Sequence, residues 1–193
     1  QRYINHPELM KFYLANREQW LSKADFSYLP ADQWNLNLNL QWTDNDYDAS
    51  NLGLNSDEWY RSHLSASYVV SDALSASVYG GYDHYRADQT GRAFNGGPEK
   101  NAFVIYPPLP QASDPNRDWD GELEDTSVTV GANLQWQAAK DVELSFDYSY
   151  VDTDSEHNLG TNGSSTLVAN DLPTVNTTLH HVQLSGIWQV KAR

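Results

Sequence analysis

W-N-L-N-L-N-L-Q-W, from Trp34 to Trp42, alternates strictly between apolar and polar side chains. Its even positions carry tryptophan or leucine, and its odd positions carry asparagine or glutamine. A period of two places the two sets on opposite faces of a β-strand. Tryptophan at both ends of the apolar set is typical of a strand whose middle meets lipid tails and whose ends meet head groups. We therefore predict a membrane-spanning strand, with lipid-facing residues Trp34, Leu36, Leu38, Leu40 and Trp42.

The same alternation recurs along the chain, and the apolar set of every repeat has even numbers. Seven segments show it, and each is long enough to cross the apolar part of an outer membrane when tilted. The predicted strands are 20–29, 34–43, 58–70, 74–84, 125–137, 142–151 and 179–190. Further residues expected to face lipid are Val128, Val130, Leu144, Phe146 and Trp188.

The connections between these segments alternate between short and long. Short turns on one side and long loops on the other are typical of bacterial outer-membrane barrels, where they are periplasmic and extracellular respectively. A soluble β-sandwich also has short strands, but it does not require every long connection at one end. We predict an all-β fold: an antiparallel meander of about seven transmembrane strands, part of a larger outer-membrane β-barrel. Residues 1–193 would form a single segment of that barrel, with 1–19 as an extracellular loop.

The opposite face of the predicted strands is rich in serine, asparagine, glutamine and threonine. A narrow barrel fills its lumen with large side chains, whereas a wide one with small polar walls can hold water or another protein. Two histidines on this face would be polar lumen residues or, alternatively, contacts to haem or to a proton. The residues expected to face the lumen and to contact a partner are Asn35, Asn37, Asn39, His63, Ser65, Ser67, Ser75, Ser77, Ser145, Ser149 and His181.

The composition excludes several functions. The 193 residues contain no cysteine and carry a formal charge of −14, which argues against disulfides, c-type haem attachment and nucleic-acid binding. The acids of the long loops form a solvated surface or, alternatively, bind a divalent cation, for which Asp44, Asp46 and Asp48 are weak candidates. We expect no enzyme activity and no catalytic residues, because no nucleophile has the partners that a triad requires.

Seven antiparallel strands would leave open edges, and an open edge cannot face lipid. The chain also ends in Val190-Lys191-Ala192-Arg193 rather than in an aromatic residue. We therefore expect the sequence to be a piece of a longer barrel protein of the bacterial outer membrane.

Three stretches resemble the MtrB/PioB family of decahaem-associated outer-membrane barrels. They are R-Y-I-N-H-P-E-L-M-K-F-Y-L-A-N-R-E-Q (Arg2 to Gln19), N-D-Y-D-A-S-N-L-G-L (Asn45 to Leu54) and S-Y-V-V-S-D-A-L-S-A-S-V-Y-G-G-Y (Ser67 to Tyr82). With the strand pattern, the resemblance covers most of the chain. It implies a late portion of a barrel of more than twenty strands.

The resemblance also implies a function. Family members enclose a periplasmic multihaem cytochrome in the lumen and let it carry electrons across the outer membrane, often to a second cytochrome on the extracellular loops. Haem would belong to the partner, so this chain is expected to bind no cofactor. The alternative is a transport barrel, either a diffusion porin or a gated receptor. A porin should show rings of charge in its lumen, and charges on the predicted inner face are sparse: Lys23, Asp25, Arg61, Asp83, Glu143 and Asp147.

Overall fold

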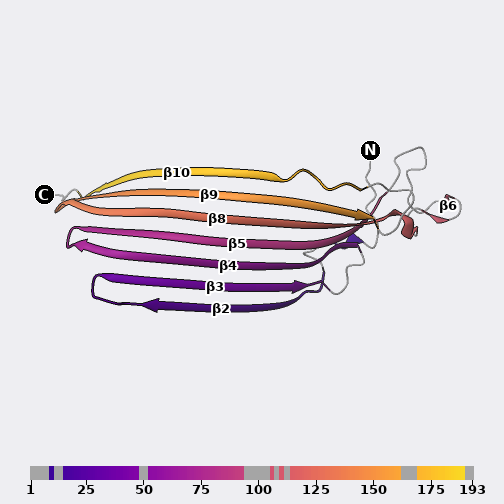
Figure 1. The fold of residues 1–193 in the computed structure, drawn as a ribbon, viewed down its shortest axis with the longest axis horizontal. Helices are drawn as coiled ribbons and strands as arrows, with labels where there is room; N and C mark the ends of the chain where they lie inside the picture. The colour runs from indigo at the N-terminus through magenta and orange to yellow at the C-terminus, as the bar shows by residue number, and fades with distance from the viewer. Residues whose placement is uncertain are drawn as a thin grey trace.

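The computed structural model of the protein describes residues 9–10, 15–47, 52–93, 105–106, 109–110, 114–161 and 169–189. Seven long strands in one antiparallel sheet dominate it (Figure 1). The strands are β2 (Glu18–Tyr28), β3 (Trp34–Asp46), β4 (Leu52–Ser71), β5 (Leu74–Arg92), β8 (Asp118–Ala139), β9 (Val142–Thr161) and β10 (Val175–Trp188).

The remaining elements are short. Strand β1 (Leu9–Met10) pairs in parallel with the first residues of β4. Strands β6 (Ile105–Tyr106) and β7 (Leu109–Pro110) pair with each other, and a 3₁₀ turn, η3 (Pro115–Arg117), leads into β8.

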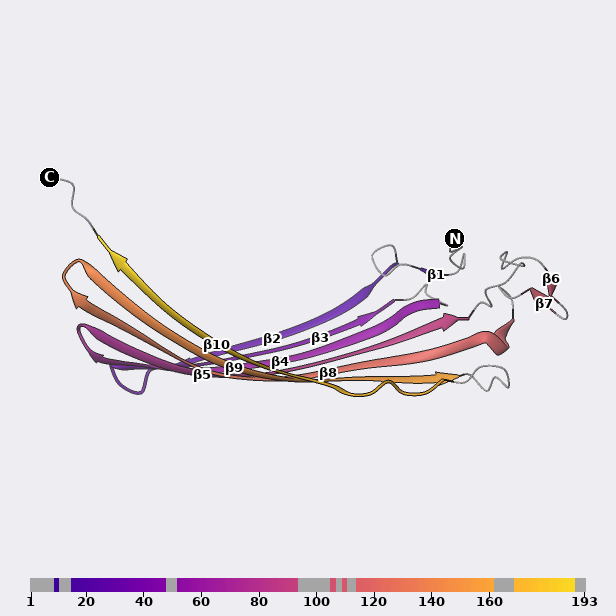
Figure 2. The ribbon, with the colours of Figure 1, turned by 90° about the horizontal axis from the view of Figure 1, so that it is seen from above.

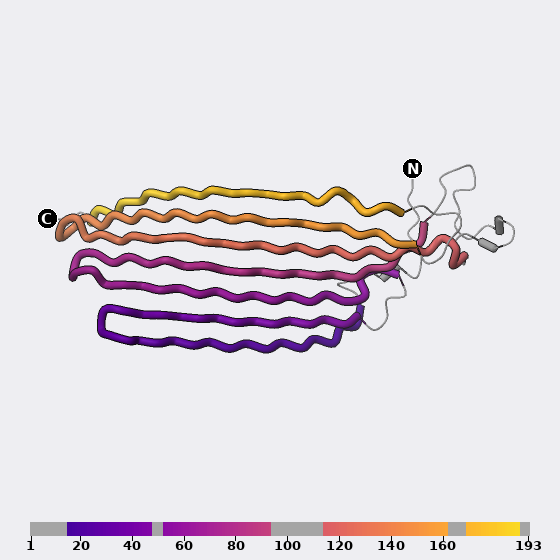
Figure 3. The backbone as a smooth tube through the Cα atoms, viewed as in Figure 1, coloured from indigo at the N-terminus to yellow at the C-terminus, as the bar shows by residue number. Residues whose placement is uncertain are grey.

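The long strands follow one another across the sheet in chain order, β10-β9-β8-β5-β4-β3-β2. The tube in Figure 3 shows the tight turns β2–β3, β4–β5 and β8–β9 at one end of the sheet, with the longer connections at the other end. The sheet is strongly twisted, so the edge strands β2 and β10 cross in the view of Figure 2. The predicted antiparallel meander is confirmed.

The register also agrees with the expectation from the alternation. Directly paired residues share a face of the sheet, and Phe26 pairs with Leu38 as Tyr28 pairs with Leu36. Residues of equal parity face each other across all six pairs of long strands, except where a bulge intervenes. The bulges lie near strand ends, at 54–56, 69–71 and 137–139, so the middle of the sheet keeps one parity on each face.

The strands extend beyond the predicted boundaries at the end that carries the long connections. Strand β5 continues to Arg92, β8 begins at Asp118 and β9 continues to Thr161, against predicted limits of 84, 125 and 151. The alternation of apolar and polar residues is lost there, but the backbone hydrogen bonds between strands do not require an apolar face. Cross-strand pairs such as Arg92 with Asp118 stabilise this part of the sheet. The predicted boundaries were therefore too short at this end.

The sheet is a single layer and has almost no core. Its large apolar side chains are exposed, with Leu184 77%, Trp188 73% and Trp20 64% accessible. Within the described ranges, no helix is long and apolar enough to cross a membrane.

Candidate functional faces of the sheet

The register divides the side chains of the seven long strands into two faces, which we call the even face and the odd face after their residue numbers. The even face carries all ten residues predicted to meet lipid, and the odd face carries all eleven predicted to line a lumen. The structure thus keeps the two predicted sets apart. Which medium each face meets remains a prediction.

On the odd face, small polar side chains lie in rows across the strands near the tight turns. Asn35, Ser67 and Ser77 form part of one such row. Asn37 lies beside Ser65 in the next row. Hydrogen bonds tie neighbouring strands together here: Ser27 Oγ donates to Asn37 Oδ1 at 2.8 Å, and the hydroxyls of Ser145 and Ser185 lie 2.5 Å apart. The wall in this region is polar and mostly uncharged, with Glu143 and Asp147 of β9 as its charged residues.

Further toward the long connections, the odd face has a hollow of about 490 Å³. Charged groups line it: Arg61 Nε lies 3.6 Å from Asp83 Oδ1, and the Arg61 guanidinium lies over the Trp59 ring, 3.0 Å from its centroid. Its lining also includes Lys23, His63 and the backbone of Gly81. The hollow brings four of the six predicted inner-face charges together: Lys23, Asp25, Arg61 and Asp83.

A polar cluster lies on the odd face at the end of the sheet with the long connections. Asn45 Nδ2 donates to Asp57 Oδ2 at 2.7 Å, and the Tyr47 hydroxyl donates to Asp57 Oδ1 at 2.9 Å. All three residues are buried. Burial raises the pKa of the Tyr47 phenol above its usual value of 10.0, and the hydrogen bond to Asp57 raises it further. The sequence analysis missed this cluster because Tyr47 lies beyond the predicted strand.

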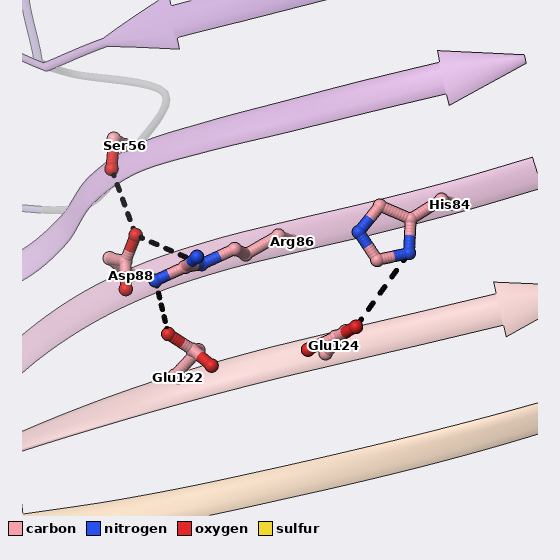
Figure 4. A network of polar contacts seen from close by, with 6 residues as sticks. All are labelled: Ser56, His84, Arg86, Asp88, Glu122 and Glu124. Carbon is pink, nitrogen blue, oxygen red and sulfur yellow. Dashed lines mark hydrogen bonds and ion pairs between the residues drawn. The ribbon is translucent and has the colours of Figure 1, made fainter.

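A second network lies at the same end on the even face (Figure 4). Arg86 is paired with both Glu122 and Asp88, and Ser56 Oγ donates to Asp88 Oδ2 at 3.4 Å. His84 Nδ1 lies 3.8 Å from Glu124 Oε1. Fixed charges on the even face are thus concentrated at the end of the sheet that carries the long connections.

The predicted metal candidates are only partly within the described structure. Asp44 and Asp46 lie on the even face of β3, and Asp48 lies outside the described residues. Among the residues that the structure describes, no three His, Cys, Asp or Glu side chains are grouped so that they could hold a metal ion.

The adjacent histidines of β10 point to opposite faces. His180, on the even face, lies 3.0 Å from the Tyr148 hydroxyl, whereas His181 Nδ1, on the odd face, lies 3.9 Å from Asp147 Oδ1. The two histidines therefore cannot share a ligand from one regular strand.

An antiparallel strand meander with one apolar exposed face and one polar face has the architecture of a wall of an outer-membrane β-barrel. Comparison with known families agrees: residues 2–193 match the family described as "Putative outer membrane beta-barrel porin, MtrB/PioB". The chain belongs to this family, and its place is the outer membrane. The family is one of barrel proteins and not a class of enzymes.

Individual proteins show more distant similarity. The chain is 22% identical over 149 residues to the outer membrane protein MtrB of Shewanella baltica (strain OS185), a match that covers 76% of this chain and 19% of that protein. The chain therefore spans about a fifth of the length of this relative. Among solved structures, the ferric yersiniabactin uptake receptor FyuA of Yersinia pestis aligns with 95% of this chain and 28% of its own, at 11% identity and a TM-score of 0.48.

Proposed function

We propose that this chain is part of the wall of a sheath that encloses a multihaem c-type cytochrome and insulates it from the membrane. The cytochrome would enter from the periplasm, and a second cytochrome outside the cell would dock on the long connections. The observation that carries the proposal is the odd face near the tight turns. Its side chains are small and mostly uncharged, and they leave room for a protein to lie close to the wall.

In this proposal the chain supplies no redox centre. It has no cysteine for c-type attachment of haem. Haem and its ligands belong to the enclosed partner, and this chain contributes a polar inner surface and an apolar exterior. Membership of the MtrB/PioB family supports the proposal, because the resemblance to that family implies a barrel that encloses a multihaem cytochrome. A relative named outer membrane protein MtrB is consistent with it.

The hollow on the odd face favours a second candidate function. Lys23, Arg61, Asp25 and Asp83 lie around it, and opposed charges inside a barrel are what a diffusion pore uses to select solutes. A porin or a gated receptor would need an open lumen, whereas a sheath needs an occupied one. Occupancy therefore separates the two candidates.

The test replaces four odd-face serines by tryptophan in the full-length protein: Ser65, Ser67, Ser77 and Ser149. The bulky rings would obstruct the lumen, so we expect loss of the cytochrome from the purified barrel, measured as haem absorbance per barrel. Transmembrane reduction of a redox dye inside liposomes should be lost with it.

A control variant introduces tryptophan at three alanines of the even face, Ala66, Ala76 and Ala132. These positions point away from the proposed lumen, so the control should bind cytochrome and conduct electrons as the unchanged protein does. The sheath proposal fails if the serine variant still binds cytochrome and conducts normally. It also fails if the barrel alone reduces the dye as fast as the complex.

A further inference from the structure

Positive charge on the odd face of the seven long strands is confined to one place. Of the lysine and arginine residues on these strands, Lys23 and Arg61 lie on the odd face, whereas Arg86 and Arg92 lie on the even face. The remaining fixed charges of the odd face are all acids: Asp25, Asp57, Asp83, Asp125, Glu143 and Asp147. Both cations line the hollow of about 490 Å³.

The two cations lie on either side of the hollow's edge. Lys23 pairs with Gln41 and Gln41 pairs with Arg61, so one row of the sheet carries all three residues across β2, β3 and β4. Two strand-to-strand steps place the cationic residues ~10 Å apart. In the next row Gly81 has no side chain, which deepens the hollow beside them. A small group entering from the lumen could therefore reach both cations.

The Arg61 side chain is held in place by an aromatic ring. Its guanidinium lies over Trp59, 3.0 Å from the ring centroid. Trp59 in turn makes an edge contact with Tyr85, with 5.9 Å between the ring centroids. Stacking covers one face of a guanidinium and leaves the N–H groups in its plane free to bind. Arg61 is thus pre-organised as a donor at the hollow.

The described residues do not satisfy the cationic donors of the hollow. Arg61 Nε is buried without a hydrogen-bond partner among them, since Asp83 Oδ1 is 3.6 Å away. Lys23 is exposed and has neither a hydrogen bond nor an ion pair within the described part of the chain. In contrast, Asp25 Oδ1 already accepts a hydrogen bond from Asn39 Nδ2 at 2.6 Å. The hollow therefore has more cationic donors than acceptors left for them.

We propose that the hollow is the docking point for a carboxylate of the enclosed cytochrome, bound between Lys23 and Arg61. The inference rests on the proposed sheath function and adds the place at which the partner is fixed. The edge of a guanidinium matches the two oxygens of a carboxylate. Repulsion from Asp83 is reduced by its ion pair with Arg61, and repulsion from Asp25 by its hydrogen bond from Asn39.

A single cationic point would fix the depth and rotation of the enclosed protein. Near the tight turns, the wall repeats serine and asparagine from row to row, so one depth there resembles the next. Complementary charges fix the register of an interface more than they raise its affinity. The hollow is the place on this wall where such a contact can be made with an anion.

A competition between barrels tests the inference. The full-length unchanged barrel and a variant, with different affinity tags, are refolded together in equal amounts. They share a limiting amount of the multihaem cytochrome that co-purifies with the unchanged barrel, and haem absorbance per barrel in each tag fraction gives the relative affinity. Lys23→Gln with Arg61→Gln should take about tenfold less haem than the unchanged barrel. Lys23→Gln alone should show part of this loss, and its exposed position leaves folding unaffected.

A redox titration of the complexes, formed with excess cytochrome, identifies the source of the carboxylate. If it is a haem propionate, loss of the two cations should lower the midpoint potential of one haem, because nearby positive charge favours the reduced iron. If it is an aspartate or glutamate away from the haems, the potentials should stay unchanged while the share of haem still falls. Both results support a bound carboxylate.

Asp83→Asn is the matched control, because it removes a charge of opposite sign from the same hollow. This variant should take as much haem as the unchanged barrel or more. Equal shares for all variants would show that the hollow does not contact the partner. A loss in Asp83→Asn as large as in the double variant, or a gain in the double variant, would show that the partner presents no carboxylate there. Each of these results overturns the inference while leaving the sheath intact, whereas absence of any cytochrome from the unchanged barrel would remove the sheath function itself.

Discussion

The ring of Tyr79 on β5 lies over Gly131, its paired residue on β8, and occupies the space that a Cβ at Gly131 would need. An aromatic ring laid across a glycine of the neighbouring strand covers exposed backbone and fixes the register. It also explains why a tyrosine can lie on the odd face without projecting far from the wall. The glycine is required here by this close approach and not by its backbone angles.

Gly131→Ala should therefore destabilise the barrel. The new methyl group overlaps the Tyr79 ring and forces it off the wall, and overpacking of this kind costs about 1–3 kcal/mol. The measurement is a urea titration of the full-length protein in lipid vesicles.

Gly81→Ala is the matched control on the same face. The contacts closest to an added Cβ there are ordinary, 3.5 Å to the Ser62 carbonyl oxygen and 3.8 Å to Thr129 Cβ. Equal losses for the two variants would contradict the role assigned to Tyr79.

The sequence predicts the central part of the sheet because lipid imposes a period of two there. Leu36 and Leu38 could be paired correctly with Tyr28 and Phe26 from parity alone. The ends of the strands were not predictable in the same way. From Asp152 to Thr161 both faces of β9 are polar apart from Leu159, and backbone hydrogen bonds hold the strand in the sheet. The cluster of Asn45, Tyr47 and Asp57 was missed for a related reason: it forms only where β3 and β4 pair beyond the stretch of alternating residues that ends at Trp42.

Tyr47 should titrate at higher pH than an ordinary tyrosine. Its pKa is raised in the folded protein, so the stabilisation from its protonated hydroxyl is fully present below pH 10.0 and is lost as the pH rises through the folded value. Difference absorbance of the phenolate, with Tyr47→Phe as reference, measures the titration.

Asp57→Asn removes the negative charge that the Tyr47 hydroxyl contacts, while an oxygen at the same place can still accept the hydrogen bond. The Tyr47 titration should then move to lower pH, although burial keeps it above the ordinary value. An unchanged titration in Asp57→Asn would show that Asp57 does not act on the phenol.

Arg86 and Arg92 lie near the end of β5 that adjoins the long connections, and they should differ in their contribution to stability. Arg92 is 13% exposed and binds Asp118 through two nitrogens, with Nη2 2.9 Å from Oδ2. Arg86 is 48% exposed, and exposed ion pairs contribute about 0–1 kcal/mol. Arg92→Gln should thus cost about 1–3 kcal/mol, and Arg86→Gln less than about 1 kcal/mol.

Salt provides a second measurement of this difference. Raising the ionic strength should remove most of the effect of Arg86→Gln, because exposed charges are screened, and less of the effect of Arg92→Gln. A larger loss for Arg86→Gln than for Arg92→Gln at low salt would be inconsistent with the contacts seen in the sheet.

Arginine at two adjacent positions of β3 distinguishes the faces of the sheet. Leu38 lies midway between Trp34 and Trp42 on the even face, so Leu38→Arg places a charge near the bilayer midplane and should cost ~2–4 kcal/mol. Asn37→Arg puts the same side chain on the odd face, beside Ser65 and Ser27. There it meets water in the empty barrel and should cost much less. Refolding titrations in vesicles measure both, and a cost for Asn37→Arg as large as that for Leu38→Arg would mean that the odd face does not line a lumen.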